Sequence, residues 1–296
     1  MVRTLINLNI IQIVLFKFKK KMTVYNAHVI PKLVNAVLKA YQDSWPRDVI
    51  RMFVCSPLDY HAQTMNWDCG YRNMQTMLSS YLNHDSIVRD QLFSRGIITI
   101  PTLKDLQKII EKAWKKGYDR IGGMQLEYSL YNTAKWIGAT EVVTMLRSCK
   151  IRACVADFDF TSGLCDLNTM IKVIWEYFSC RCNKKKENCK INFKAFIVPL
   201  YLQHQGHSRL ILGAEKWVSG EIKLLILDPQ WRRAIQFQAR EGNEANILRQ
   251  GIGTHGLSSK AKYQIAYLAQ KNLYKEEKEN CKIIVDELRH PKLKFI

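Results

Sequence analysis

The order in which helix and strand patterns follow one another restricts the fold of this chain more than any other feature. Apolar residues recur at helical spacing through most of the first half, and short apolar runs bounded by turn residues gather in the second half. A regular alternation of strand and helix would instead predict a parallel sheet. We therefore expect an α+β fold. The expected helices cover 31–41, 70–82, 102–116, 139–148 and 167–178, and the expected strands cover 151–158, 195–202, 210–214, 222–227 and 263–268.

Composition divides the chain into four segments. Residues 1–22 combine an apolar stretch with a Lys cluster, and we interpret them either as disordered or as the product of an over-extended gene model. Their apolar run is too short and too interrupted by polar residues to span a bilayer. We expect no membrane partner, and a helix on a membrane surface is the less favoured alternative. Residues 23–50 are expected to form an N-terminal helical arm, 51–274 the main domain, and 275–296 a highly charged tail.

The chain is strongly basic, with 45 Lys and Arg against 26 Asp and Glu and a formal net charge of +19. Such an excess favours acidic partners, above all nucleic acid. The basic residues are scattered, however, and no helix-turn-helix, zinc-finger or aromatic RNA-binding motif accompanies them. The charge is therefore compatible with a nucleic-acid partner, but no sequence motif indicates one.

Nine cysteines are present, and their spacing matches no disulfide framework. Cys180, Cys182 and Cys189 lie close together in the sequence but lack the second ligand pair of a zinc site. We therefore expect free thiols, no metal and no cofactor. Free thiols are typical of reducing compartments, which predicts a cytoplasmic or nuclear protein.

Cys69 stands immediately before the helix expected over 70–82, in the segment NWDCGYR. The positive end of a helix dipole favours the thiolate and lowers the pKa of a thiol at this position. Only the thiolate attacks a carbonyl carbon well, so this placement makes Cys69 a candidate nucleophile. A lone cysteine is more often a buried structural residue, and the interpretation depends on its partners.

A candidate base and acid lie at the two ends of one expected hairpin. His207 opens a strand, the chain turns near 217–220, and Asp228 follows the returning strand. Cross-strand partners in such a hairpin face one another, which predicts His207 opposite Asp228. A carboxylate beside an imidazole fixes the tautomer and stabilises the imidazolium that thiol catalysis needs. The order Cys, His, acid is that of papain-like enzymes; His204 is the competing histidine, and we assign it no chemical role.

An oxyanion donor is also required, because negative charge develops on the carbonyl oxygen during attack. The backbone N–H of Cys69 at the helix start is one donor. Gln203 and Gln63 are both candidates for the second, and Gln63 lies six residues before the nucleophile, as the oxyanion Gln does in papain-like proteases.

Five segments together resemble the zinc-finger-containing ubiquitin peptidase family (ZUFSP), and the resemblance covers roughly residues 31–268. It implies a papain-like cysteine protease fold with a central antiparallel sheet flanked by helices. The family is related to proteases of the ubiquitin-fold modifier. The segments are WDCGYRN (67–73), AWKKGYD (113–119), KWIGA (135–139), YLQHQGHSR (201–209) and LILDP (225–229).

The resemblance also implies an activity and roles for residues. It indicates a thiol-dependent deubiquitinase that cleaves after the C-terminal Gly of ubiquitin, with ubiquitin or polyubiquitin as partner. We expect the protein to be a monomer. Cys69 would be the nucleophile, His207 the base, Asp228 its orienting acid and Gln203 the oxyanion donor, which ranks Gln203 above Gln63. Asp119 and Glu141 would hold the C-terminal tail of the modifier, which carries Arg residues before Gly-Gly in ubiquitin.

The chain departs from the family pattern in ways that keep alternatives open. The modifier proteases take the catalytic His from an Asp-Pro-His segment, but here the segment reads Asp228-Pro229-Gln230, which favours ubiquitin over the other modifier. The family's zinc fingers are absent from this sequence. Asp68 replaces a small residue before the nucleophile, and its charge is expected to raise the pKa of the thiol. The alternatives are a weak or inactive ubiquitin- or nucleic-acid-binding protein, and a protease of another ubiquitin-like modifier.

Overall fold

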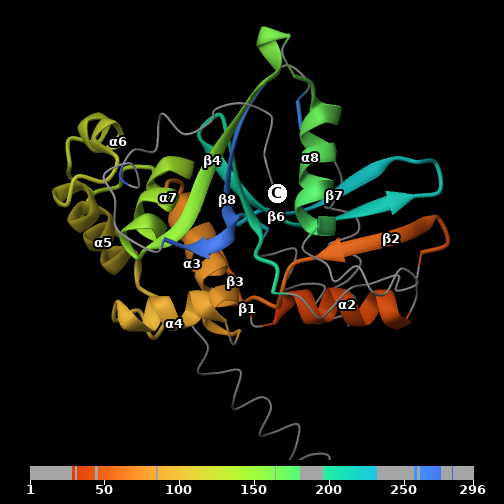
Figure 1. Cartoon of the computed structure of the whole chain (residues 1–296), viewed down its shortest axis with the longest axis horizontal. Coiled ribbons are helices and arrows are strands. Elements are labelled where there is room, and N and C mark those ends of the chain that lie inside the picture. Colours follow the sequence, from red (N-terminus) through yellow and green to blue (C-terminus); the bar gives the residue numbers. More distant parts are fainter. Residues whose placement is uncertain are drawn as a thin grey trace, which may run out of the picture.

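The computed structural model describes residues 29–30, 32–43, 46–84, 86–163, 165–180, 196–231, 257–258, 261–274 and 282. The segments expected at residues 1–22 and at 275–296, apart from Lys282, lie outside the described residues. So do Cys182 and Cys189. Within the described part, helices and an antiparallel sheet occupy separate layers, which confirms the α+β class (Figure 1).

A six-stranded antiparallel sheet forms the centre of the molecule. Its strands lie in the order β2-β6-β5-β8-β4, and β7 pairs with β6. A separate two-stranded sheet joins β1 (Val29–Ile30) to β3 (Tyr60–His61). The six strands are β2 (Val49–Val54), β4 (Ile151–Asp159), β5 (Leu200–His204), β6 (His207–Trp217), β7 (Ile222–Leu227) and β8 (Lys262–Leu273).

Helices cover the sheet on two sides. The α3 helix packs against β6 and α7 packs against β4 and β8, whereas α8 packs against β2, β6 and β7. In Figure 1, α5, α6 and α7 gather beside β4, and α8 lies on the other side of that strand. The helices are α2 (Leu33–Asp43), α3 (Cys69–Leu82), α4 (Ile87–Ser94), α5 (Leu103–Lys115), α6 (Arg120–Gln125), α7 (Ala139–Ser148) and α8 (Leu167–Cys180), with a 3-10 turn at Phe160–Ser162.

The expected helices are all present, and local sequence explains their ends. Thr102 and Asp105 form a reciprocal capping box that starts α5, and Gly117, with φ +86°, follows its end. The expected strand over 195–202 begins only at Leu200, because Pro199 has no amide hydrogen to give to a ladder. The sequence patterns missed β1, β2, β3, α4 and α6 altogether.

The expected helical arm belongs to the same core as the sheet. Four apolar residues of α2 are buried in one cluster with residues of the main domain, and β2 begins at Val49, before the expected boundary at residue 51. The β2 strand pairs with β6, so the arm leads directly into the sheet that carries the expected histidine. The four residues of α2 are Leu33, Val34, Leu38 and Tyr41.

A tight turn between β5 and β6 sets the position of that histidine. Gln205 and Gly206 both have positive φ, at 41° and 76°, as a two-residue hairpin turn of the primed type requires. A side chain at Gly206 would also collide with Trp136, whose ring lies 2.7 Å from the position of a Cβ. The turn therefore needs glycine both for its backbone conformation and for its approach to Trp136.

Candidate active site

Cys69 is the first residue of α3 and is 4% exposed. Burial acts to raise the pKa of its thiol, but hydrogen bonds with His207 and Ser208 outweigh burial and hold that pKa below its ordinary value. Cys55 and Cys149 are equally buried, yet burial raises the pKa of both, to about 11 for Cys149. Among these three buried cysteines, only Cys69 has a lowered pKa and so forms the thiolate more readily than an ordinary cysteine.

His207 lies between the thiol and a buried carboxylate. Its Nε2 is 3.0 Å from each carboxylate oxygen of Asp228. The ring also makes a hydrogen bond with Cys69, and because Nε2 is already used, Nδ1 is the nitrogen available for it. Burial acts to lower the pKa of His207, but Asp228 and Cys69 outweigh it and raise that pKa to about 9. The expected contact between the carboxylate of Asp228 and a ring nitrogen of His207 is confirmed.

The hairpin register differs from the expectation by two residues. The β6–β7 ladder pairs Leu210 with Leu227, so continuing it places Arg209, and not His207, in line with Asp228. His207 still reaches the carboxylate because residues two apart on a strand point to the same face. Arg209 Nε donates to Asp228 Oδ2 at 2.7 Å. Burial acts to raise the pKa of Asp228, but the bonds from His207 and Gln230 and the charges of His207 and Arg209 outweigh it and lower that pKa.

His204, the competing histidine, belongs to a different environment. Its ring stacks on Tyr263 with centroids 4.4 Å apart, and no hydrogen-bond partner for its Nε2 is found in the described part of the chain. Burial, followed by the charge of Arg209, lowers the pKa of His204, and Cys69 makes no contribution to it. The histidine that meets the thiol is therefore His207.

The two glutamines proposed as oxyanion donors are used differently. Gln63 Nε2 donates to the carbonyl oxygen of Met65 at 2.6 Å, which commits its amide to the local loop. Gln203 accepts a hydrogen bond from the Tyr201 hydroxyl through Oε1 at 3.2 Å, and its Nε2 has no partner among the residues that the structure describes. Gln203 pairs across the ladder with Ser208, which contacts Cys69. The geometry thus favours Gln203 over Gln63.

Asp119 and Glu141 form a buried pair of carboxylates. Asp119 is 2% and Glu141 5% exposed, and a Cβ at Gly122 would lie 2.1 Å from Asp119 Oδ2 and 3.1 Å from Glu141 Oε1. They are not the ordinary surface acids that a sequence suggests. Burial raises the pKa of both, and the charge of Asp119 adds to the effect on Glu141. Only the absence of a side chain at Gly122 lets the two approach.

Neutral groups hold this carboxylate pair in place. Gly122 N donates to Asp119 Oδ1 at 3.2 Å and Thr144 Oγ1 donates to Asp119 Oδ2 at 3.2 Å. Gly138 N donates to Glu141 Oε2 at 2.7 Å, and Thr140 Oγ1 donates to Oε1 at 3.0 Å. Within the described residues, neither carboxylate has a salt bridge. Asp119 N also donates to the carbonyl oxygen of Lys282 at 2.8 Å, which brings one point of the charged tail to this pair.

Asp68 is fully buried, and its carboxylate is engaged. Arg72 Nε donates to its Oδ2 at 2.9 Å, so the negative charge has a cation next to it. The pKa of Cys69 is lowered although this carboxylate is its neighbour in the sequence, and the expected effect of the Asp68 charge on the thiol stays a prediction.

Sequence reasoning missed three residues of the site. Arg209 could have been found from strand alternation, since it follows His207 by two positions. Ser208 contacts Cys69 and accepts a hydrogen bond from Asn73 Nδ2 at 2.9 Å. Tyr201 is buried beside Cys69 and Gln203, and no pattern in the sequence marks it. No group of three or more residues suited to hold a metal occurs in the described ranges, and no helix there is long and apolar enough to cross a membrane.

Comparisons with known proteins connect these motifs to one family. The sequence model of peptidase family C78 matches residues 48–266. Zinc finger-containing ubiquitin peptidase 1 of Homo sapiens is 34% identical over 239 residues, which are 79% of this chain and 40% of that protein. Ubiquitin carboxyl-terminal hydrolase mug105 of Schizosaccharomyces pombe is 33% identical over 172 residues, which are 57% of this chain and 62% of that protein.

The chain spans about 40% of the length of its mammalian relatives. Among solved structures, UfSP from C. elegans aligns with a TM-score of 0.49 at 15% identity, covering 83% of this chain and 38% of that one.

Proposed function

The chain belongs to peptidase family C78, and from that premise we propose that it is a thiol-dependent deubiquitinase. Its reaction is cleavage of the peptide or isopeptide bond after the C-terminal Gly of ubiquitin, within polyubiquitin chains. The observation that carries the proposal is the thiol of Cys69, with a lowered pKa, in contact with an imidazole that Asp228 holds through two 3.0 Å contacts.

The geometry supports a two-step reaction. The Cys69 thiolate attacks the carbonyl carbon of the terminal Gly, and the Cys69 N–H and Gln203 Nε2 stabilise the oxyanion. As the C–N bond breaks, imidazolium His207 gives its proton to the leaving amine, and a thioester remains. A water molecule then gives a proton to His207 and attacks the thioester, which releases the ubiquitin carboxylate and regenerates the Cys69 thiolate.

Asp228 orients His207 in both steps. Its carboxylate accepts from Nε2, which leaves Nδ1 to face the thiol. Arg209 and the backbone N–H of Gln230, at 2.7 and 2.9 Å, fix the carboxylate itself. Position 230 is the one at which the modifier proteases carry their histidine, and Gln230 uses only its backbone here, so His207 is the available base.

The Asp119–Glu141 pair supports a basic tail as substrate. Two buried carboxylates without a salt-bridge partner among the described residues form an incomplete site, because buried charges are stable chiefly when paired. The tail of ubiquitin brings Arg residues before its terminal Gly-Gly, and a guanidinium can satisfy a carboxylate through two parallel hydrogen bonds. We assign these two residues to recognition of that tail.

Other parts of the proposal rest on composition. The six cysteines that the structure describes are free, which supports action in the reducing cytoplasm or nucleus. The net charge of +19 favours an additional nucleic-acid partner and leaves a non-catalytic binding protein as the alternative. We take the working unit to be a monomer, since one chain holds every group that the reaction uses.

A ubiquitin probe with a C-terminal electrophile tests the function. Wild-type protein should form a covalent adduct, and Cys69→Ala should form none. Cys180→Ala, which removes an exposed free thiol, is the matched control and should label as the wild type does. A probe built on the ubiquitin-fold modifier is run in parallel. Labelling by that probe alone would assign the other substrate, and labelling that persists in Cys69→Ala would refute the nucleophile.

A further inference from the structure

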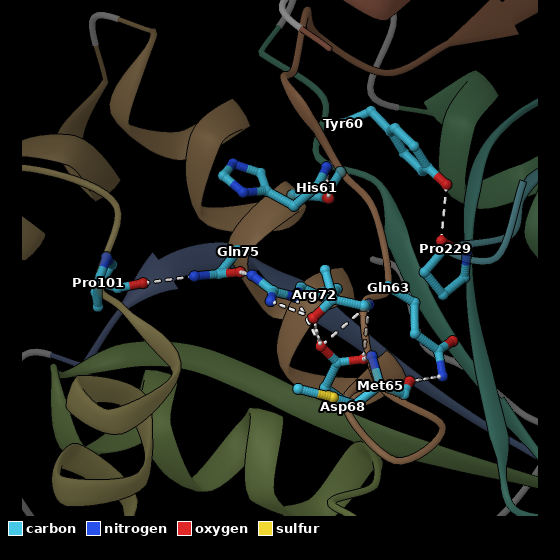
Figure 2. A network of polar contacts seen from close by, with 11 residues as sticks. Tyr60, His61, Gln63, Met65, Asp68, Arg72, Gln75, Pro101 and Pro229 are labelled. Atoms are coloured by element: carbon cyan, nitrogen blue, oxygen red, sulfur yellow. Dashed lines mark hydrogen bonds and ion pairs between the residues drawn. The ribbon is translucent and has the colours of Figure 1, made fainter. Parts of the chain in front are cut away.

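The loop of residues 62–68, between β3 and α3, connects the two halves of the candidate active site. At its start, Gln63 N donates to the carbonyl oxygen of Pro229 at 2.8 Å. Tyr60 Oη, one residue before His61, donates to the carbonyl oxygens of Pro229 at 2.8 Å and Asp228 at 3.0 Å. The loop ends at Asp68, directly before Cys69. Figure 2 shows Tyr60 pointing at Pro229 and Asp68 at the other end of the loop.

The Asp68 carboxylate folds this loop back onto the start of α3. It accepts hydrogen bonds from Thr64 N at 3.2 Å, from Met65 N at 3.1 Å and from Thr64 Oγ1 at 2.8 Å. Asp68 occupies the N-cap position, yet its side chain makes no capping bond to α3. An aspartate at this position ordinarily accepts from the first amides of its helix. Here the carboxylate is used by the loop and by Arg72 instead of by the first amides of α3.

Arg72, one turn along α3, completes the arrangement. Its Nε donates to Asp68 Oδ2 at 2.9 Å and its Nη2 donates to Thr64 Oγ1 at 2.9 Å, so the three side chains bond one another in a ring. Its Nη1 donates to Gln75 Oε1 at 3.0 Å, and Gln75 Nε2 donates to the carbonyl oxygen of Pro101 at 2.8 Å (Figure 2). The network therefore also reaches the residue before the cap of α5.

Only one charged pair lies at the centre of this network. His61 is buried next to it, and burial, with the charge of Arg72, outweighs the charge of Asp59 and lowers the pKa of His61 to about 4. His61 is thus neutral near pH 7 and does not compete with Arg72 for Asp68. On the far side of Cys69 the facing groups are His207, Ser208 and Tyr201.

We propose that Asp68, Arg72 and Thr64 act as a clamp that positions Cys69 against His207. The clamp holds the end of a loop whose beginning is bonded to the backbone of the catalytic acid, so it sets the separation between nucleophile and base. Asp68 is a positioning residue and does not touch substrate. The proposal rests on the proposed function of Cys69 and goes beyond it, since it gives the acidic residue before the nucleophile a supporting role.

The clamp and a direct charge effect predict opposite signs. If the Asp68 charge acted directly on the thiol, its removal would lower the pKa of Cys69, because a like charge disfavours the thiolate. If Asp68 positions Cys69, its removal weakens the contact with the imidazolium of His207 and raises the pKa of Cys69. The variant Asp68→Asn distinguishes the two, because it removes the charge and keeps nearly the same shape.

The experiment measures the rate at which iodoacetamide alkylates Cys69, followed by mass spectrometry of its peptide across pH, together with steady-state cleavage of a fluorogenic ubiquitin amide. Asp68→Asn should move the acidic limb of the alkylation profile to higher pH. It should also lower kcat by roughly tenfold or more, as expected for loss of charge-assisted hydrogen bonds. KM should stay within about twofold, since the tail-binding acids are not changed.

Two further variants and one control keep the test decisive if Asp68→Asn folds poorly. Thr64→Val changes an exposed residue, keeps the charge of Asp68 and should shift the acidic limb in the same direction by a smaller amount. Asp68→Asn combined with Arg72→Gln should lose little more than the worse single variant, as residues acting together do. Asp90→Asn removes a surface partner of Arg89 and should behave as the wild type.

The results separate the clamp from the proposed function. A limb that moves to lower pH in Asp68→Asn, or unchanged alkylation and turnover in both Asp68→Asn and Thr64→Val, overturns the clamp while leaving Cys69 as nucleophile. Absence of cleavage by the wild type would instead overturn the proposed substrate, and the alkylation profiles would still decide whether the clamp positions the thiol.

Discussion

The Asp228 site and the Asp119–Glu141 site both hold buried carboxylates, but the pKa values of these carboxylates shift in opposite directions. Asp228 is 4% exposed, and Asp119 and Glu141 are 2% and 5% exposed. Despite this similar burial, the pKa of Asp228 is lowered and the pKa values of Asp119 and Glu141 are raised. The difference lies in their partners. His207 and Arg209 form ion pairs with Asp228, whereas amides and hydroxyls bond the other pair, and the charge of Arg147 acts on Asp119 without a salt bridge between these two described side chains.

The comparison separates a complete site from an incomplete one. Asp228 already has its cations, so its charge is fixed in the free protein and serves chemistry. Within the described residues the Asp119–Glu141 pair makes no salt bridge, and the charge of Arg147 only partly offsets the effect of burial on Asp119, so the pair gains most when a ligand supplies a cation. On this view the free enzyme is less stable than it would be with neutral side chains at the second site. A bound substrate with a basic tail should offset the free-energy cost of burying the two carboxylates. The predictions below test this contrast.

The largest expected effect is at the complete site. His207→Ala should lower kcat by at least about a thousandfold, because both the imidazolium partner of the thiolate and the proton donor are lost. Asp228→Asn should retain more turnover than His207→Ala, since the amide keeps much of the geometry. The measurement is steady-state cleavage of a fluorogenic ubiquitin amide. His204→Ala is the matched histidine control and should stay within about twofold of wild type; an equal loss there would remove His207 as the unique base.

A smaller loss, confined to substrate binding, is expected at the incomplete site. Asp119→Asn and Glu141→Gln should each raise KM for the ubiquitin substrate by about tenfold or more, because a buried charge-assisted contact is lost. Their alkylation by iodoacetamide should match the wild type, since the thiol and His207 are intact. Asp157→Asn, which changes an acid on strand β4, is the control. Equal KM values in all four proteins would show that the pair does not bind the tail.

The pH dependence of kcat/KM should be bell-shaped. As the pH rises, activity should appear when the Cys69 thiol ionises, at a pH below the ordinary pKa of a cysteine. Activity should fall again near pH 9, as His207 loses its proton. In Asp228→Asn the alkaline limb should move to lower pH, because the imidazolium loses its anion. In Glu141→Gln that limb should stay in place. An alkaline limb that fails to move in Asp228→Asn would mean that the acid does not control the base.

The smallest effect concerns stability, and it should have opposite signs at the two sites. Asp228, with a lowered pKa, stabilises the fold above its unfolded value near 3.9, and this is lost as pH falls through the folded value. Glu141, with a raised pKa, disfavours the folded state once pH exceeds its unfolded value near 4.3. At pH 7, Glu141→Gln should therefore raise the thermal midpoint and Asp228→Asn should lower it, each by about a few degrees. Shifts of the same sign would contradict the contrast.

Much of the site could be predicted because it depends on local pattern. The spacing of apolar residues predicted α3, α5 and α7, and the position of Cys69 at a helix start made it the candidate nucleophile. Strand ends and a turn between them brought His207 and Asp228 together, although the register was displaced and Arg209 was missed. These inferences succeed because helix dipoles and strand alternation act over a few residues.

The rest depends on contacts between distant segments. The α6 helix has the sequence RIGGMQ, whose two glycines are poor helix formers, and it forms where Gly122 fits against Asp119 and Glu141. The burial of those acids depends on α6 and α7 together, and the sequence of either helix alone suggests only surface carboxylates. The role of Asp68 depends likewise on Arg72 and on the fold of the preceding loop. No local pattern contains that information.

The close fit at Gly122 has a consequence for mutational tolerance. One methyl group there would lie 2.1 Å from Asp119 Oδ2, so we expect Gly122→Ala to displace this carboxylate and to weaken the proposed recognition of the basic tail, while every acidic and catalytic group remains in the chain. We therefore expect substitution at this position to weaken the proposed substrate recognition without changing any residue of the sequence motifs. Such a variant should keep every sequence motif of the family and a reactive Cys69 thiol, but it should no longer bind a basic tail through Asp119 and Glu141.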